Sequence, residues 1–130
     1  MQGERKAVGR TVLIVEDNRL IRKLIAAAFT AAGFAQCFEA DNGRQGIELA
    51  KQIHPDLITF DLSMPGMNGL ETAAELRKPL LQIPTILFTS FVNETPHFVA
   101  AKSGISLVLS KGVSLSTFVA HGHTLIDQNS

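Results

Sequence analysis

Five charged or hydroxyl side chains stand at or just after the ends of short apolar segments in this 130-residue sequence. Three of them are acids: Glu16 and Asp17 follow one segment, and Asp61 follows another. Thr89 ends a third segment, and Lys111 comes shortly after a fourth. If these segments are parallel strands of one sheet, their carboxyl ends share one edge, where binding sites of open sheets gather. The spacing therefore predicts one site that contains three carboxylates, a hydroxyl and an ammonium group.

Such a set of groups suits phosphoryl chemistry. Three carboxylates in a small site repel one another, and a bound divalent cation relieves that repulsion. Oxygen ligands without histidine or cysteine favour Mg²⁺, which takes one or two carboxylates and leaves places for phosphate oxygens. An ammonium and a hydroxyl opposite the metal are what a phosphoryl group requires. A carboxylate can also be the nucleophile that accepts the phosphoryl group.

Alternating β-like and amphipathic segments supply the elements that would position this site. The apolar runs are short, β-branched and nearly continuous, which is typical of strands buried on both faces of a parallel sheet. The predicted strands cover Thr11–Val15, Ala35–Ala40, Leu57–Phe60, Thr85–Thr89 and Leu107–Leu109.

Five helices are expected to alternate with these strands, because apolar residues recur at helical spacing and capping residues flank them. In the first helix, Arg19–Ala32, the apolar residues are Ile21, Leu24, Ile25, Ala28, Phe29 and Ala32. The other helices are expected over about Gly43–Gln52 with Asn42 as the cap, about Gly69–Arg77, between Thr95 and Gly104, and from Ser114 or Ser116 to about Asp127. These five units predict a doubly wound α/β fold around a five-stranded parallel sheet.

Length and composition fit one domain and exclude several classes of protein. Residues 1–10 are expected to form a flexible N-terminal tail, and residues 11–128 the folded domain. The 12 Lys and Arg residues balance 12 Asp and Glu residues, so bulk charge predicts no direct binding to nucleic acid or to a membrane surface. Cys37 is the single cysteine, which suits a reducing compartment, and no apolar run predicts membrane insertion. We therefore expect a cytoplasmic protein.

Four segments resemble the receiver domain of two-component response regulators, in the single-domain form found in chemotaxis. VLIVEDNRLIRKL resembles the first strand, acidic pair and first helix of the family, and HPDLITFDLSMPGMNGLE resembles its phospho-acceptor segment. IPTILFTS resembles the fourth strand with its hydroxyl switch residue, and GISLVLSK resembles the fifth strand with its lysine. The resemblance covers about Thr11 to Asp127 and implies the flavodoxin-like strand order 2-1-3-4-5.

The resemblance also implies the roles of the acids. Asp61 would accept a phosphoryl group from the phosphohistidine of a histidine kinase or a histidine phosphotransfer protein. Asp17, Asp61 and the backbone carbonyl of Ser63 would bind Mg²⁺ directly, and Glu16 would hold the metal mainly through water. The chain would then be a phosphorylation-controlled switch that changes its interaction surface.

The phosphoryl-binding and output positions follow from the same resemblance. Lys111 would pair with the phosphoryl oxygens, and Thr89 would move to hydrogen-bond one of them. Two positions depart from the family pattern: Gly112 stands where proline is common, and Val108 stands where an aromatic ring commonly follows the movement of the switch residue. Because valine is short and stiff at χ1, we predict that Phe91 carries the output coupling instead.

An aspartate-nucleophile phosphohydrolase of related α/β fold is the alternative function. Such enzymes place a second acid two residues after the nucleophile, where this sequence has Ser63, and they normally need a cap or a longer chain. We therefore predict a phospho-acceptor regulator that catalyses only its own phosphorylation and slow dephosphorylation. His121 and His123 are two residues apart on a predicted helix, so they do not face one way and are not expected to bind a metal together.

Overall fold

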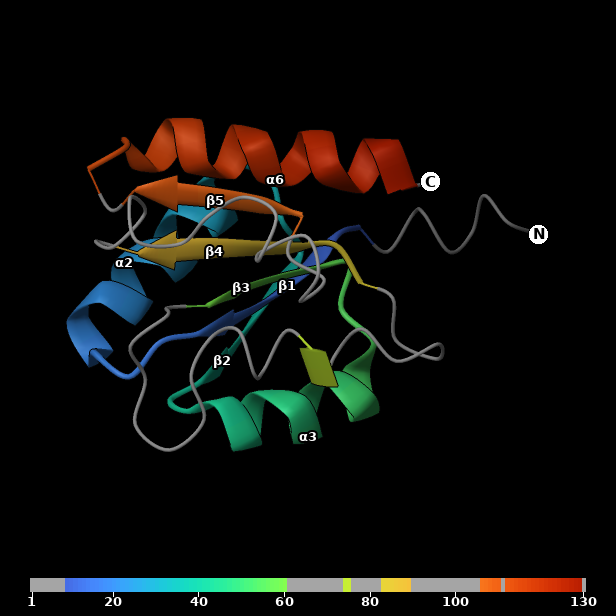
Figure 1. Ribbon diagram of the computed structural model, residues 1–130. Coiled ribbons are helices and arrows are strands. Elements are labelled where there is room, and N and C mark those ends of the chain that lie inside the picture. Colours follow the sequence, from blue (N-terminus) through green and yellow to red (C-terminus); the bar gives the residue numbers. More distant parts are fainter. Residues whose placement is uncertain (1–8, 61–73, 76–82, 90–105, 111, 130) are drawn as a thin grey trace.

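The computed structural model describes residues 9–60, 74–75, 83–89, 106–110 and 112–129. Within these residues, five parallel strands form one sheet in the order β2-β1-β3-β4-β5 (Figure 1). The strands are β1 (Thr11–Val15), β2 (Gln36–Ala40), β3 (Leu57–Phe60), β4 (Thr85–Thr89) and β5 (Leu107–Ser110), and the helices are α2 (Arg19–Ala31), α3 (Gly43–Ile53) and α6 (Leu115–Asn129). The predicted α/β fold and strand order are confirmed.

Strand boundaries follow the apolar runs because β1 and β3 lie inside the sheet and are covered on both faces. The bounds of β1, β3 and β4 are those predicted, while β2 begins one residue later and β5 ends one residue later than expected. All four residues of β3 are buried, whereas β2, at the edge of the sheet, has a buried side chain only at Ala40. The strands that the predicted acids follow, β1 and β3, are therefore almost wholly buried.

In α2, α3 and α6, the side chain of the residue before the helix accepts a hydrogen bond from an amide of the first turn. The Asn18 side chain accepts a hydrogen bond from the Ile21 amide, and the Asn42 side chain accepts one from the Gln45 amide, as predicted for Asn42. For α6, the Ser114 hydroxyl accepts a hydrogen bond from the Thr117 amide over 3.2 Å, which decides between the two serines considered as caps.

Only part of the apolar surface of α2 is buried. Ile25 and Phe29 are buried against the sheet, but Leu24 is 50% exposed, and Leu20 is 69% exposed. Leu24 lies four residues after Leu20 and shares its exposed side of the helix. Helical spacing alone therefore does not show which apolar residues of α2 are buried, because one helix on a sheet buries less than the full width of its apolar surface.

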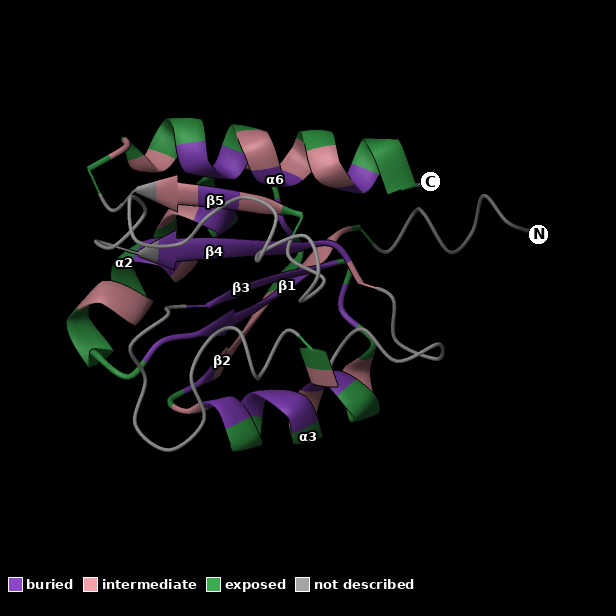
Figure 2. Ribbon diagram, viewed as in Figure 1, coloured by how far each residue is buried: buried purple, intermediate pink, exposed green. Residues whose placement is uncertain are grey.

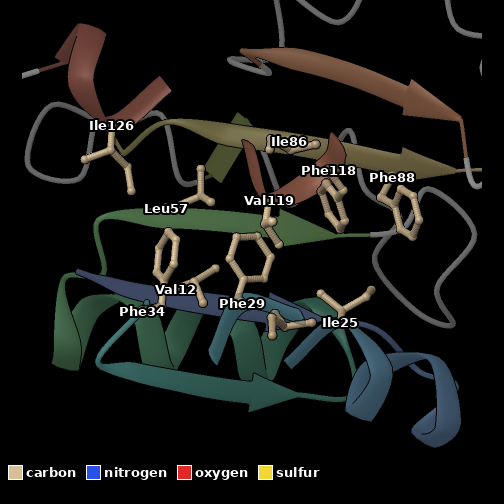
Figure 3. Packing of buried hydrophobic residues seen from close by; sticks show 11 residues of the cluster. Val12, Ile25, Phe29, Phe34, Leu57, Ile86, Phe88, Phe118, Val119 and Ile126 are labelled. Atoms are coloured by element: carbon tan, nitrogen blue, oxygen red, sulfur yellow. The ribbon is translucent and has the colours of Figure 1, made fainter. Parts of the chain in front are cut away.

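Two hydrophobic clusters lie on the two faces of the sheet, because alternate residues of each strand point to opposite sides. α2 and α6 cover one face, where Phe29, Phe88 and Phe118 meet (Figure 3). The Phe88 and Phe118 rings stack with centroids 4.3 Å apart, and Phe29 meets Phe118 edge-on at 5.6 Å. α3 covers the other face with Ile47 and Ala50, and the inner strands β1, β3 and β4 between the helices are mostly buried (Figure 2).

Two predicted helices fall largely outside the described residues. Of the helix expected over about Gly69–Arg77, only residues 74–75 are described, and they are helical. The helix expected between Thr95 and Gly104 lies wholly outside the described part of the chain. None of the helices that the structure describes is long and apolar enough to cross a membrane.

Candidate functional site

The parallel sheet brings the carboxyl ends of its strands to one edge. Val15 pairs with Phe60 in the register of β1 and β3. In the sequence, Glu16 directly follows Val15 and Asp61 directly follows Phe60. Thr89, the last residue of β4, pairs with Ser110, the last residue of β5.

Part of the predicted site lies outside the described residues. Asp61, Ser63, Phe91 and Lys111 are not described, and of Thr89 only its place in β4 is described. Asp61 and Lys111 each follow in sequence the last residue of a described strand, and these strand ends lie at the same edge of the sheet as the end of β1. Their roles therefore remain predictions.

The two described acids differ sharply in their surroundings. Glu16 is only 2% exposed, and its carboxylate Oε2 accepts a hydrogen bond from the Asn18 amide over 3.2 Å. Its own amide donates to the carbonyl of Ala40 over 3.0 Å, which continues the β1–β2 pairing by one residue. Asp17 is exposed. Glu16 is thus fixed by the fold, while the Asp17 carboxylate faces solvent and can receive a cation.

Arg22, on α2, connects the residue that follows β1 to the outermost strand, β2. Arg22 Nη1 donates to the carbonyl oxygen of Glu16 over 2.8 Å, and Arg22 Nε donates to Glu39 Oε1 over 3.0 Å. Lys23 Nζ lies 3.1 Å from the other carboxylate oxygen of Glu39. Burial raises the pKa of Glu39, but the hydrogen bonds and positive charges of Lys23 and Arg22 outweigh burial and hold that pKa below its usual value.

Sequence reasoning missed Arg22 and Glu39. The available signal was weak. Glu39 is a charged residue in a strand whose consecutive residues Cys37 and Phe38 point to opposite faces of the sheet. The register of β2 against β1, which pairs Glu39 with Ile14, shows that this carboxylate lies on the face covered by α2.

Val108 occupies the position at which the family often has an aromatic ring. It pairs with Leu87 and is 9% exposed, packed in the cluster that contains Val15 and Phe60. Its side chain is thus part of the core on the α3 face of the sheet. A valine here fills core volume next to the strands of the predicted site.

The donor set fits Mg²⁺ as far as it is described. Glu16 and Asp17 would supply carboxylate oxygens at one strand end, and Mg²⁺ typically takes one or two carboxylates and keeps several waters. Among the described residues no group of three or more His, Cys, Asp or Glu side chains could enclose a metal ion. Glu16 and Asp17 therefore suit a hard cation that needs only a few protein ligands.

Known proteins resemble this chain along most of its length. The family model of the response regulator receiver domain matches residues 12–122. The nitrate/nitrite response regulator NarL of Escherichia coli K12 is 41% identical over 107 residues, which are 78% of this chain and 47% of NarL. The chemotaxis protein CheY of Thermotoga maritima is 39% identical over 97 residues, 75% of this chain and 81% of CheY. A LuxR-family DNA-binding response regulator structure from Staphylococcus aureus superposes with a TM-score of 0.81 at 28% identity, over 90% of this chain and 98% of that one.

Fold, site and similarity agree on the class of protein. The chain belongs to the response regulator receiver domain family of two-component signalling. It spans 47% of the length of NarL and most of the length of CheY.

Proposed function

We propose that the chain is a phosphorylation-controlled switch of a two-component phosphorelay, with Asp61 as the acceptor. The observation that carries the proposal is the pairing of Val15 with Phe60, because it brings the end of β1, which Glu16 and Asp17 follow, beside the end of β3, which Asp61 follows in sequence. The family supports the same function. As a receiver domain without excess positive charge, it is expected to act in the cytoplasm and to bind neither nucleic acid directly nor the bilayer.

The proposed reaction moves one phosphoryl group. A carboxylate oxygen of Asp61 attacks the phosphorus of a phosphohistidine on a histidine kinase or histidine phosphotransfer protein. The O–P bond forms as the P–N bond breaks, and the electron pair of that bond goes to the imidazole nitrogen. Lys111 pairs with the phosphoryl oxygens, and the Thr89 hydroxyl donates a hydrogen bond to one of them.

Asp17, Asp61 and the backbone carbonyl of Ser63 would hold Mg²⁺ directly, with Glu16 acting mainly through water. Bound there, the ion would offset negative charge at the carboxylates and the phosphoryl oxygens. The buried, hydrogen-bonded Glu16 keeps the chain in place next to Asp17, whose side chain is exposed.

Phosphorylation by a small donor tests the acceptor. With acetyl phosphate and Mg²⁺, intact-mass analysis should show one labile phosphoryl adduct, which Asp61→Asn should remove. Asp41→Asn is the matched control, since Asp41 is an exposed acid directly after β2. An undiminished adduct on Asp61→Asn would overturn the assignment, and steady turnover of a phosphomonoester would favour the phosphohydrolase instead.

A further inference from the structure

The peptide bond between Glu16 and Asp17 is held through its carbonyl oxygen. That oxygen accepts the hydrogen bond from Arg22 Nη1 over 2.8 Å, while the amide on the other side of Glu16 donates to the carbonyl of Ala40. Because the peptide group is planar, the position of its oxygen sets the orientation of the whole unit. The contact from Arg22 therefore fixes the direction in which the chain leaves β1 and presents Asp17.

Arg22 is itself fixed at both ends. Its amide donates to the Asn18 carbonyl over 2.9 Å in the first turn of α2, and its Nε donates to Glu39 over 3.0 Å. The Arg22 side chain is 14% exposed and that of Glu39 is 24% exposed, so water competes little for this pair. A guanidinium presents its N–H groups in a rigid fork, so an Nε held by Glu39 also sets where Nη1 points.

We propose that Arg22 is a positioning residue for the metal-binding acids, and that it acts by bridging the Glu16 carbonyl to Glu39. The inference rests on the proposed function, since it assumes that Asp17 binds Mg²⁺. Groups that orient metal ligands from outside the coordination shell typically change metal affinity 10- to 100-fold when they are removed. Arg22 touches neither acid's carboxylate, yet it holds the backbone that carries both.

Lys23 provides the matched control in the same cluster. It shares the Glu39 carboxylate with Arg22, but its side chain is 53% exposed and makes no described contact with Glu16. Removing Lys23 takes away a charge next to Glu39 and leaves the bridge to the Glu16 carbonyl intact. Any effect confined to Arg22 variants therefore comes from that bridge and not from the local loss of positive charge.

Titration calorimetry with MgCl₂ on the full chain tests the proposal. Arg22→Met should weaken Mg²⁺ binding about 10-fold or more, and Lys23→Met should change it by less than about twofold, as expected of an exposed ion pair. Arg22→Lys should remain clearly weaker than wild type, because one ammonium group cannot reproduce the two fixed donors. If Arg22→Met does not fold, Arg22→Lys carries the test. Wild-type affinity in the folded Arg22 variants would overturn the positioning role.

A second measurement separates this inference from the function on which it rests. In metal-free protein, the ¹⁵N–¹H resonances of Asp17 and Asn18 should shift in the Arg22 variants and stay in place in Lys23→Met; unshifted resonances would contradict the bridge. Asp17→Asn should lose most Mg²⁺ binding. Unchanged binding in Asp17→Asn would overturn the proposed metal site and the inference together, whereas lost binding in Asp17→Asn with normal binding in the Arg22 variants would overturn the inference alone.

Discussion

Arg10 Nη1 lies 2.8 Å from Nδ1 of His123, and this contact joins the residue before β1 to the last helix. The other ring nitrogen of His123, Nε2, lies 3.0 Å from the carbonyl oxygen of Ala32. A carbonyl can only accept and a guanidinium can only donate, so Nε2 carries the proton and Nδ1 accepts from Arg10. The ring also packs against Phe34, with ring centroids 4.7 Å apart. His123 thereby links three segments that are distant in sequence.

His123→Leu is expected to lower the free energy of unfolding by about 1–2 kcal/mol, because it removes two hydrogen bonds at part-buried positions. Asp127→Ala is the control: Asp127 pairs with the same guanidinium but is 64% exposed, so its loss should cost less than about 1 kcal/mol. Urea denaturation measures both. A loss in Asp127→Ala that exceeds the loss in His123→Leu would show that the surface ion pair, and not the imidazole, is the main link between α6 and the start of β1.

The lowered pKa of Glu39 predicts a pH-dependent contribution to stability. A carboxylate with a folded-state pKa below its usual 4.5 stabilises the fold above that value, and the contribution is lost as pH falls through the lower, folded-state pKa. The difference in unfolding free energy between wild type and Glu39→Gln should therefore be full near neutral pH and shrink below about pH 4. Denaturant titrations at several pH values measure this difference. A difference that grows with acidification would show the opposite sign and refute the ion-pair account.

Gly46→Ala is expected to destabilise the protein although alanine favours helices. A Cβ at Gly46 would lie 2.8 Å from Cγ2 of Val15, which is fully buried and stiff at χ1. Overpacking typically costs about 1–3 kcal/mol, against a helix-propensity gain of about 1 kcal/mol. The contact itself can be tested in a Val15→Ala background, where Gly46→Ala should become neutral or stabilising. A loss of equal size in both backgrounds would locate the cause elsewhere.

Val108→Ala is expected to cost about 1–2 kcal/mol of stability, because Val108 is buried in the core, and to leave phosphorylation-dependent partner binding in place. Phe91→Ala is predicted to shorten the lifetime of phospho-Asp61 and to weaken that binding. Decay of the phosphoryl adduct and affinity for a partner captured with beryllofluoride-treated protein measure the two effects. Loss of switching in Val108→Ala, with Phe91→Ala unaffected in both measurements, would assign the output to strand β5.

The strands could be predicted from sequence because burial on both faces leaves a readable signal. Leu57–Phe60 and Thr11–Val15 are nearly uninterrupted apolar runs. Apolar runs this short are more typical of buried strands than of helices. Contacts between elements leave no comparable signal. The bridge from Arg22 to Glu39 depends on the phase of α2 and the register of β2, and neither is set by local sequence. The exposure of Leu24 could not be predicted for a similar reason, since the spacing of apolar residues does not show how much of a helix the sheet covers.

The strand order has a consequence for how stability and signal duration can vary. The chain leaves β1 toward β2 and leaves β3 toward β4, so the connections after these two neighbouring strands run in opposite directions. Where connections part in this way, open α/β sheets leave a crevice outside the strand ends. A binding site in this crevice needs no cavity in the hydrophobic core. The residues that pack the sheet need not move when the residues of the site change. If the proposed function holds, substitutions in the segments after β3 and β4 are therefore expected to change the lifetime of phospho-Asp61 more than they change the melting temperature.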